Sequence, residues 1–366
     1  VLVVPLVFVS LVCGVCHLRD QSSLGWLSAK TIGLYLITTG LAISVALILA
    51  TWLKPGAGVN MPLDADYTPP ATMPLIDVLV NIFPTNPVAA MAEGNMLQVI
   101  VFALLIGIAI GRSGEFGDRI GAHFNDWNEV LMKLVTVLMH FAPYGVFCLL
   151  FTLFSQQGIG KVGDLLVYML TVVGALLLHG FVVYPLLLKS LSGLSPVIFL
   201  RKMRNAQLFA FSTASSTATV PVTLRTVEER MGVKNRVAAF AVPLGATINM
   251  DGTAIMQGVA TVFIAQAFQL NLAMTDYLLV IMTAMLASIG TAGVPGVGLV
   301  TLALVLQQVG LPLEGIALII GVDRILDMMR TAVNITGDSM VSVVVAKSEK
   351  AIDTDTYQNL KAGEQE

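Results

Sequence analysis

Long apolar stretches separated by short polar or charged segments dominate the hydrophobic pattern of this chain. About 20 consecutive apolar residues are needed for an α-helix to cross the hydrocarbon core of a bilayer. The pattern therefore predicts an all-α integral membrane protein, a multi-span helical bundle. The predicted spans are residues 1–16, 31–53, 83–111, 129–154, 164–188, 237–269 and 316–346.

Two further apolar stretches, 196–225 and 277–312, are interrupted at their centres by hydroxyl residues and Pro, and the second also by several Gly. The interruptions read STASSTATVP at 212–221 and SIGTAGVPGVG at 288–298. Gly and Pro at this density break a helix into halves, and each half is too short to cross. The sequence therefore predicts two re-entrant helical hairpins, each returning to the side from which it entered.

The distribution of basic residues tests this topology, because Lys and Arg collect in the short loops on the cytoplasmic side. If both hairpins return, sixteen of the 20 basic residues lie on one side and two on the other, with two inside the last span. If both segments crossed instead, the split would weaken to twelve against six. The charges favour re-entrant hairpins and a C-terminus in the cytoplasm.

The two hairpins resemble each other in sequence. Residues 217–221 and 291–295 share the pattern Thr-Ala-x-Val-Pro, and each hairpin precedes a span with a polar segment. Those segments, 249–253 and 334–338, share Asn-x-x-Gly and predict a helix break in both spans. One hairpin would open from the cytoplasm and the other from outside. Broken segments in matching halves indicate an inverted repeat with a binding site near the membrane midplane.

Composition narrows the function classes. Of the 366 residues, 56% are hydrophobic and 12% charged, and the mean hydropathy is +0.84, values that do not suit a soluble globule. A net charge of −3 with no Lys/Arg-rich run argues against a nucleic acid partner. Three cysteines are too few for a disulfide framework, and no cofactor is expected. The bilayer is the environment that this composition fits.

The last predicted span carries a polar face. At 100° per residue its polar side chains fall within a stripe roughly 100° wide. A charge at the bilayer centre costs at least ~2.5 kcal/mol, so such a stripe faces protein, water or a ligand. An internal set of ion pairs is the alternative, but it would not require the uncharged oxygen donors. The stripe consists of Asp323, Asp327, Arg330, Thr331, Asn334 and Asp338.

The chemistry of these side chains indicates an acidic amino acid as ligand. The guanidinium of Arg330 suits bidentate contact with a carboxylate, and Asp327, one turn away, suits an ammonium group. A second ligand carboxylate would meet hydroxyls and backbone N–H groups at the hairpin tips, above all at Ser215 and Ser216. Hard oxygen donors without Cys or His suit an alkali cation. These donors are Asn249, Asp251, Asn334 and Asp338.

Three motifs together carry a resemblance over essentially the whole chain: NMDGT at 249–253, GTAGVPG at 290–296, and DMMRT at 327–331 followed by Asn334 and Asp338. They resemble the dicarboxylate/amino acid:cation symporter family, the glutamate transporter homologues. The resemblance implies a homotrimeric transporter of the plasma (inner) membrane, not an enzyme, that moves acidic amino acids by an elevator-like motion. Sodium ions or protons would be the coupling ions.

The resemblance also implies a division of the chain, which would begin in the family's second helix. Scaffold and trimerisation helices would occupy 1–27 and 83–157. The transport domain would comprise 28–54 and 158–348, including both hairpins. Residues 55–82 read as an external loop and 349–366 as a mobile cytoplasmic tail.

Site roles follow from the same resemblance. With Asp323 of the polar face, the implied substrate-binding residues are Ser215, Ser216, Thr253, Gly293, Val294, Gly298, Asp327, Arg330, Thr331 and Asn334. The implied sodium sites are Gly245, Asn249, Asn334 and Asp338 for one ion, Thr247, Ser288, Ile289 and Thr291 for a second, and Tyr35, Thr38, Thr39, Asn249 and Asp251 for a third.

Departures from the family leave alternatives open. Relatives carry an arginine at the position of Ala214 or of Met328, and Arg324 stands near enough to replace it. Retention of Asp327 and Asp338 favours aspartate or glutamate over dicarboxylates that lack an amine. A proton-coupled dicarboxylate or neutral amino acid symporter and an anion-conducting channel stay as alternatives. An intramembrane aspartyl protease is disfavoured, because its flanking motifs are missing around the two candidate aspartates.

Overall fold

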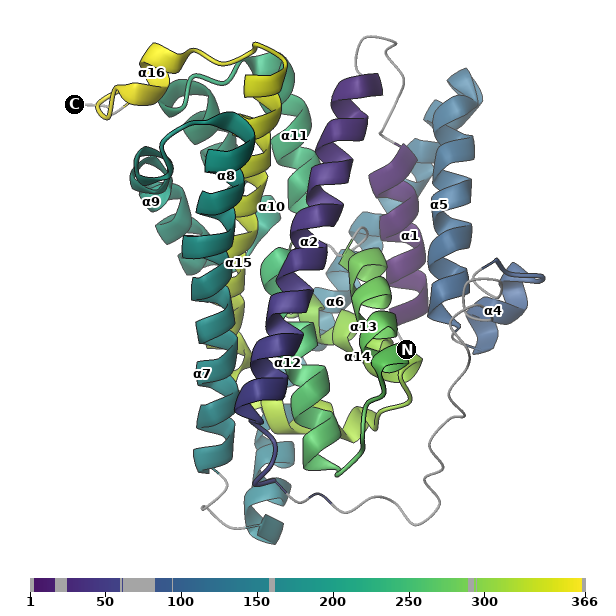
Figure 1. Cartoon of the computed structure of the whole chain (residues 1–366). Helices are drawn as coiled ribbons and strands as arrows, with labels where there is room; N and C mark the ends of the chain where they lie inside the picture. Colours follow the sequence, from purple (N-terminus) through teal and green to yellow (C-terminus); the bar gives the residue numbers. More distant parts are fainter. Residues whose placement is uncertain are drawn as a thin grey trace.

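The computed structural model describes residues 3–16, 25–59, 61, 83–93, 95–157, 162–288, 293 and 295–363. These residues form helices and no β-strand, apart from one isolated bridge between Val233 and Ile352, so the predicted all-α architecture is confirmed for the described part. The long helices stand side by side (Figure 1). Their bounds are α1 Val3–Cys16, α2 Gly25–Leu53, α4 Pro87–Glu93, α5 Met96–Arg112, α6 Gly114–Gln157, α7 Val162–Leu178, α8 Tyr184–Ser192, α9 Pro196–Thr213, α10 Ser216–Arg225, α11 Asn235–Ile248, α12 Asp251–Ala267, α13 Met274–Ser288, α14 Val297–Gln308, α15 Ile316–Ser348 and α16 Thr354–Gln358.

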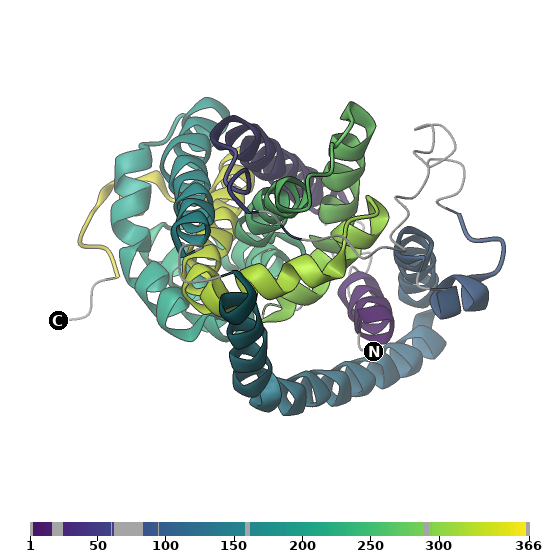
Figure 2. The ribbon, with the colours of Figure 1, turned by 90° about the horizontal axis from the view of Figure 1, so that it is seen from below.

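Two helical stretches among the described residues, Trp26–Leu53 and Leu165–Ser192, are both long and apolar enough to cross a bilayer. Other predicted spans are divided or carry charge. The stretch 83–111 is split into α4 and α5, and 237–269 into α11 and α12. Large apolar side chains are exposed over much of the surface, as on α6, which curves along one side of the bundle (Figure 2). Such a surface is stable against lipid and not against water.

The stretch 196–225 forms a pair of helices folded back on each other. Ala214 ends α9 in the left-handed region at φ 50°, and the Ser215 hydroxyl caps α10 by accepting from the N–H of Ala218 at 3.2 Å. At the open end, Lys202 of α9 donates to the carbonyl of Arg230 beyond α10. The two ends of this pair therefore lie together, and its tip is the turn at 214–215.

The predicted breaks in the two polar spans have different outcomes. Asn249 and Met250 leave the helical region and separate α11 from α12, as expected. The helix α15 instead runs unbroken through Asn334–Asp338, so the second predicted break is wrong. Gly337 serves close packing there, because a Cβ would collide with the Tyr184 hydroxyl and the Asn249 amide. Its role is to bring three elements together.

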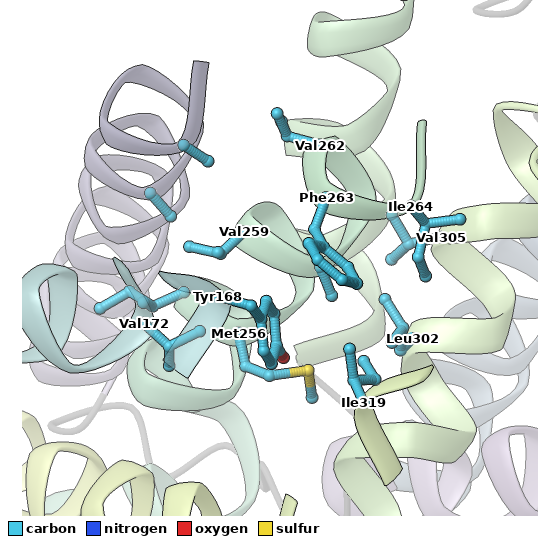
Figure 3. Packing of buried hydrophobic residues seen from close by; sticks show 14 of the residues in the cluster. Tyr168, Val172, Met256, Val259, Val262, Phe263, Ile264, Leu302, Val305 and Ile319 are labelled. Atoms are coloured by element: carbon cyan, nitrogen blue, oxygen red, sulfur yellow. The ribbon is translucent and has the colours of Figure 1, made fainter. Parts of the chain in front are cut away.

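The core consists of three clusters of buried apolar residues. One joins α2, α7 and α12 to α14 and the start of α15, with Tyr168 and Phe263 rings 4.9 Å apart at its centre (Figure 3). A second joins α8–α11 to the second half of α15. The third holds α1, α4 and α5 together and touches the hairpin helices α13 and α14 through Ala287 and Leu304. The first two clusters surround the polar stretch of α15.

The C-terminal segment differs from the mobile tail expected from the sequence. Residues 349–363 pack against the open end of the first hairpin, where Tyr357 is fully buried and donates to the Ser195 carbonyl at 2.9 Å. Burial raises the pKa of the Tyr357 phenol. Asp353 caps α16, and hydrogen bonds from the Thr356 hydroxyl and then the Asp355 N–H hold the pKa of its carboxyl below the ordinary value.

Candidate functional site

A fully buried arginine lies at the centre of the polar face of α15. Nη2 of Arg330 is 2.9 Å from a carboxylate oxygen of Asp323 and 2.9 Å from one of Asp327. None of its three guanidinium nitrogens, Nε, Nη1 and Nη2, has a hydrogen-bond partner among the described residues, so Asp323 and Asp327 hold Nη2 through ion pairs alone. A buried donor without a partner is costly, and the fork geometry matches a carboxylate. Nε and Nη1 therefore offer a binding position for an anionic group.

The second hairpin lies against this arginine. The N–H of Gly296 donates to Asp327 Oδ2 at 3.1 Å, which ties the second hairpin to α15. A Cβ on Gly298 would lie 3.3 Å from Nη1 of Arg330 and 3.3 Å from the methyl group of Thr253. The predicted ligand residues from α12, α14 and α15 are therefore brought together by the fold.

The hairpin tips touch each other next to this position. The Ser215 hydroxyl donates to the Gly293 carbonyl at 2.6 Å, and the Thr217 N–H donates to the same oxygen at 3.2 Å. Ser216 is buried alongside them. A Cβ on Gly293 would approach Thr217 and the Ala246 carbonyl to 2.8–2.9 Å, so only glycine permits this contact.

The first predicted cation set is brought together around Asn249. Its amide donates to Asp338 Oδ1 at 2.9 Å and to the Asn334 carbonyl at 3.3 Å. The side chain of Asn334 in turn accepts from the N–H of Gly252 at 2.7 Å, which supplies a partner to the start of α12. A Cβ on Gly245 would collide with the Asp338 carboxylate. The four residues form one buried cluster rich in oxygen.

The third predicted cation set forms a second buried cluster, around Asp251. Its Oδ1 accepts from the Thr39 hydroxyl at 2.6 Å. The Thr38 hydroxyl lies 3.2 Å from Asn249 Oδ1, which joins the two clusters. The Tyr35 ring is fully buried beside them, with its hydroxyl donating to the Ala241 carbonyl at 2.9 Å. All members of this set meet where α2, α11 and α12 come together.

The remaining predicted residues are only partly placed. Ser288 is buried beside the break between α11 and α12. Its hydroxyl donates to the Ile248 carbonyl and accepts from the Met250 N–H, both at 3.2 Å. The hydroxyls of Thr247 and Thr331 donate to carbonyls of their own helices, those of Leu244 and Asp327. Ile289, Thr291 and Val294 lie outside the described residues.

Two residues of the Asp251 cluster, His179 and Tyr184, are absent from the site predicted from the sequence. The Tyr184 hydroxyl donates to Asp251 Oδ2 at 2.8 Å, and Nε2 of His179 lies 3.3 Å from the same oxygen. Both rings are fully buried. The available signal was two polar rings inside one strongly apolar span.

Local backbone geometry explains how these two rings reach one carboxylate. Residues 179–183 form a single π-helical turn, η2, between α7 and α8. Pro185 lacks an N–H and crowds the carbonyl of Phe181, which favours a widened turn. The wider turn places residues five apart on one face, and the His179 and Tyr184 ring centroids lie 4.5 Å apart.

The charges of the site favour a cation. Asp251 and Asp338 are buried, and His179, 3.3 Å from Asp251, is the only basic side chain of the described residues within ion-pair distance of either. Buried carboxylates are tolerated only when a proton, a cation or hydrogen bonds compensate them. The neighbouring oxygens come from hydroxyls, amides and carbonyls, which are the donors that hard cations prefer.

Comparison with known proteins identifies the family of the chain. A family model described as the sodium:dicarboxylate symporter family matches residues 1–348. The chain is 35% identical to the proton/glutamate-aspartate symporter of Escherichia coli (strain K12) over 96% of this chain and 83% of that protein. It is 34% identical to the proton/sodium-glutamate symport protein of Bacillus caldotenax, over 95% and 84%. It is also 36% identical to a C4-dicarboxylate transport protein of Rhodospirillum rubrum, over 97% and 81%.

Two of these relatives are named as symporters and the third as a transport protein, and their names give different substrates and coupling ions. The family model and the relatives each cover most of the chain. The buried arginine, the paired hairpin tips and the oxygen-rich clusters lie inside the matched range. The chain belongs to the sodium:dicarboxylate symporter family of membrane transporters, and this family assignment confirms the resemblance drawn from its motifs.

Proposed function

We propose that this protein is a secondary active transporter that imports an acidic amino acid, aspartate or glutamate, together with sodium ions. The observation that carries the proposal is the arrangement at Arg330, whose Nε and Nη1 have no hydrogen-bond partner among the described residues while Nη2 forms ion pairs with Asp323 and Asp327. The free nitrogens receive the side-chain carboxylate of the ligand. Asp323 and Asp327 keep the guanidinium in place before the ligand arrives.

An amino acid fits better than a plain dicarboxylate because of Asp327. One of its oxygens meets Arg330 and the other accepts from the Gly296 N–H, and each oxygen has a further lone pair for an ammonium group. The ligand's main-chain carboxylate lies toward the first hairpin, near the hydroxyls of Ser215 and Ser216 and the N-terminus of α10. Arg330 and the Gly296 N–H are two partners of the Asp327 carboxylate, and a ligand without an amine would not supply the third.

Sodium coupling rests on the two buried carboxylate clusters. Asp251 and Asp338 carry negative charge into the protein unless a cation or proton joins them. An acidic amino acid adds further negative charge beside them. Binding of cations at both clusters would compensate this charge, which makes ligand and cation binding mutually favourable. The second set, at Ser288 in the second hairpin, contributes a further cation position.

The proposed transport cycle is elevator-type alternating access. Helices α2 and α7–α15 would form a transport domain that moves against scaffold helices α1, α4, α5 and α6, the latter also forming a homotrimer. The two hairpins are re-entrant in this proposal and related as inverted repeats, with the second as the outer gate. The C-terminus lies in the cytoplasm, on the side that carries most of the Lys and Arg residues.

Uptake of labelled aspartate into liposomes containing the purified protein tests this function. A sodium gradient, a proton gradient or neither is applied, with labelled succinate as the control for a dicarboxylate without an amine. Concentrative aspartate uptake with sodium alone is expected. Uptake driven only by protons would keep the ligand and replace the coupling ion. Uptake of succinate in preference to aspartate would overturn the role of Asp327, and flux without concentration would indicate a channel.

A further inference from the structure

A crevice on the outside of the helical bundle lies apart from the functional site. Its volume is about 240 Å³, and its walls come from α7 with the turn η2, from α9 and from α15. The walls are almost entirely apolar, with Leu176, Phe181, Leu208, Phe211 and Val333 among the lining residues. Pockets that enclose a drug-sized ligand have volumes of at least about 300 Å³. This partly open crevice is smaller, so it holds one part of a larger molecule.

The crevice contains one charged group, and this group is unpaired. Gln207 donates to the Thr336 hydroxyl at 2.9 Å, and that hydroxyl donates to the Ala332 carbonyl at 2.6 Å, so these polar groups satisfy each other. Arg204 lines the crevice, is exposed, and forms no hydrogen bond or ion pair with a described residue. The lining contains no carboxylate. An occupant with an apolar part and an anionic end is complementary to this surface.

The crevice lies behind the helix that carries the functional site. At 100° per residue, the α15 residues that line it, Met329, Ala332, Val333 and Thr336, are centred about 160° from the polar face. A side chain that fills the crevice therefore points away from Arg330 and Asp338. Binding in the crevice and binding at the functional site can be measured independently.

The surroundings of the crevice indicate where the occupant comes from. Leu177, Phe181 and Leu208 are 46%, 58% and 61% exposed. The helices α7, α8 and α9 stand on the side of the bundle away from α1 and α5 (Figures 1 and 2). In a membrane protein, exposed apolar side chains on an outer face meet acyl chains, so the crevice opens toward lipid.

We propose that this crevice binds an anionic phospholipid of the surrounding bilayer, with one acyl chain between α7 and α9 and the phosphate at Arg204. Arg204 is eight residues from Pro196, where α9 begins, which places its Cα about 12 Å along the helix. A long arginine side chain reaches from such a depth toward the headgroup level. Arg201, one turn nearer to Pro196, is also exposed, forms no ion pair with a described residue, and adds to the local positive charge.

Photocrosslinking tests the proposal with the full chain in phosphatidylcholine nanodiscs. The probe is phosphatidylglycerol with a diazirine in one acyl chain, and adducts are located by mass spectrometry. Adducts are expected on the peptides containing Phe181, Leu208 and Met329, with competition by unlabelled phosphatidylglycerol and not by phosphatidylcholine. Adducts confined to other helices, or equal competition by both lipids, would overturn the proposal.

Two variants and a matched control give the second measurement. Arg204→Gln removes the charge and Ala332→Phe fills the crevice, and each is expected to weaken phosphatidylglycerol labelling about tenfold. Arg201→Gln removes an equal charge outside the crevice lining and is expected to change labelling less than twofold, on the order of 0.4 kcal/mol. Equal loss in the two arginine variants would show a diffuse electrostatic effect and contradict a defined site. Arg204→Gln alters an exposed side chain, and an unchanged elution profile in size-exclusion chromatography checks that the variant is folded. Labelling of this folded variant at the level of the parent would also contradict the proposal.

Discussion

At the scale of single residues, the pairing of Arg330 changes what its substitution should do. Both Asp323 and Asp327 depend on its Nη2, so a neutral residue would leave two buried carboxylates without a cation, a loss of about 3–5 kcal/mol. A fall in uptake in such a variant would then reflect both the lost ligand contact and the lost stability of the folded protein. A lysine at this position separates the two effects, because it keeps a positive charge and lacks the second and third nitrogen donors.

We therefore predict that Arg330→Lys keeps most of the stability and loses acidic amino acid transport. Concentrative aspartate uptake should fall at least about 100-fold, since a bidentate charge-assisted contact contributes about 3 kcal/mol. Thermal unfolding of the purified variant checks stability, and Arg330→Ala serves as the destabilised comparison. Aspartate affinity equal to that of the parent in Arg330→Lys would rule out the guanidinium as the carboxylate contact.

A second prediction concerns Tyr184, whose hydroxyl donates to Asp251 Oδ2 at 2.8 Å. Tyr184→Phe should raise the sodium concentration for half-maximal uptake about five- to tenfold, because one buried hydrogen bond to a charged group is lost. Selectivity between aspartate and succinate should stay unchanged. Tyr277→Phe is the matched control, because the Tyr277 hydroxyl lies 3.3 Å from the Thr51 hydroxyl in an exposed position outside both clusters. The same sodium dependence in both variants would remove Tyr184 from the cation cluster.

At the scale of elements, the sequence predicted what depends on local composition. Ser, Thr and Pro at 212–221 predicted the helix pair α9–α10, and Asn249 predicted the break before α12. The same Asn-x-x-Gly pattern gave a wrong break in α15, where Gly337 makes room for Tyr184 from a distant helix. His179 was missed because its partner lies 72 residues away in the chain. Contacts between elements, unlike breaks within them, leave no signal in local composition.

The contact between the hairpin tips leads to a third prediction. Gly293→Ala would place a Cβ 2.8–2.9 Å from Thr217 and the Ala246 carbonyl, so the tips must separate. A cysteine at Ala214, on a Cys-free background, should then react faster with a water-soluble maleimide. Gly298→Ala, whose Cβ would lie 3.2–3.3 Å from its neighbours, is the control and should change this rate little. Equal rates in Gly293→Ala and the parent would show that the tips accommodate the methyl group.

A fourth prediction concerns the C-terminal segment, which Tyr357 anchors on the first hairpin. Tyr357→Ala should release residues 349–363 to limited proteolysis, because removing a buried aromatic ring costs about 3 kcal/mol. Tyr357→Phe loses only the hydrogen bond to Ser195 and should stay resistant. The lowered pKa of Asp353 means that its ionised form favours docking. That contribution is complete above its ordinary pKa near 3.9 and is lost as the pH falls through the lowered value. Equal proteolysis of the alanine variant and the parent would contradict anchoring by Tyr357.

At the scale of the whole molecule, α15 connects every function assigned or proposed here. Its polar face holds Arg330, Asn334 and Asp338. Asn334 links the ligand position to the cation cluster, because its carbonyl accepts from the Asn249 amide and its side chain accepts from the Gly252 N–H. Its opposite face forms the floor of the lipid crevice. A helix without a break transmits a shift at one of these positions to the others more directly than two halves would. Coupling between cation and ligand is therefore expected as a property of the intact bundle.

The final prediction is a reciprocal effect of sodium and aspartate on thermal stability. A ligand at 100 times its Kd stabilises the folded protein by about 2.7 kcal/mol, and coupling requires each ligand to strengthen the binding of the other. Aspartate should therefore raise the Tm in sodium and leave it almost unchanged in choline at equal ionic strength. Asp338→Asn should reduce the sodium dependence of this shift, because the carboxylate that Asn249 contacts is removed. An aspartate shift of equal size in sodium and choline would show that ligand binding proceeds without the cation, and the charge argument built on Asp251 and Asp338 would then fail.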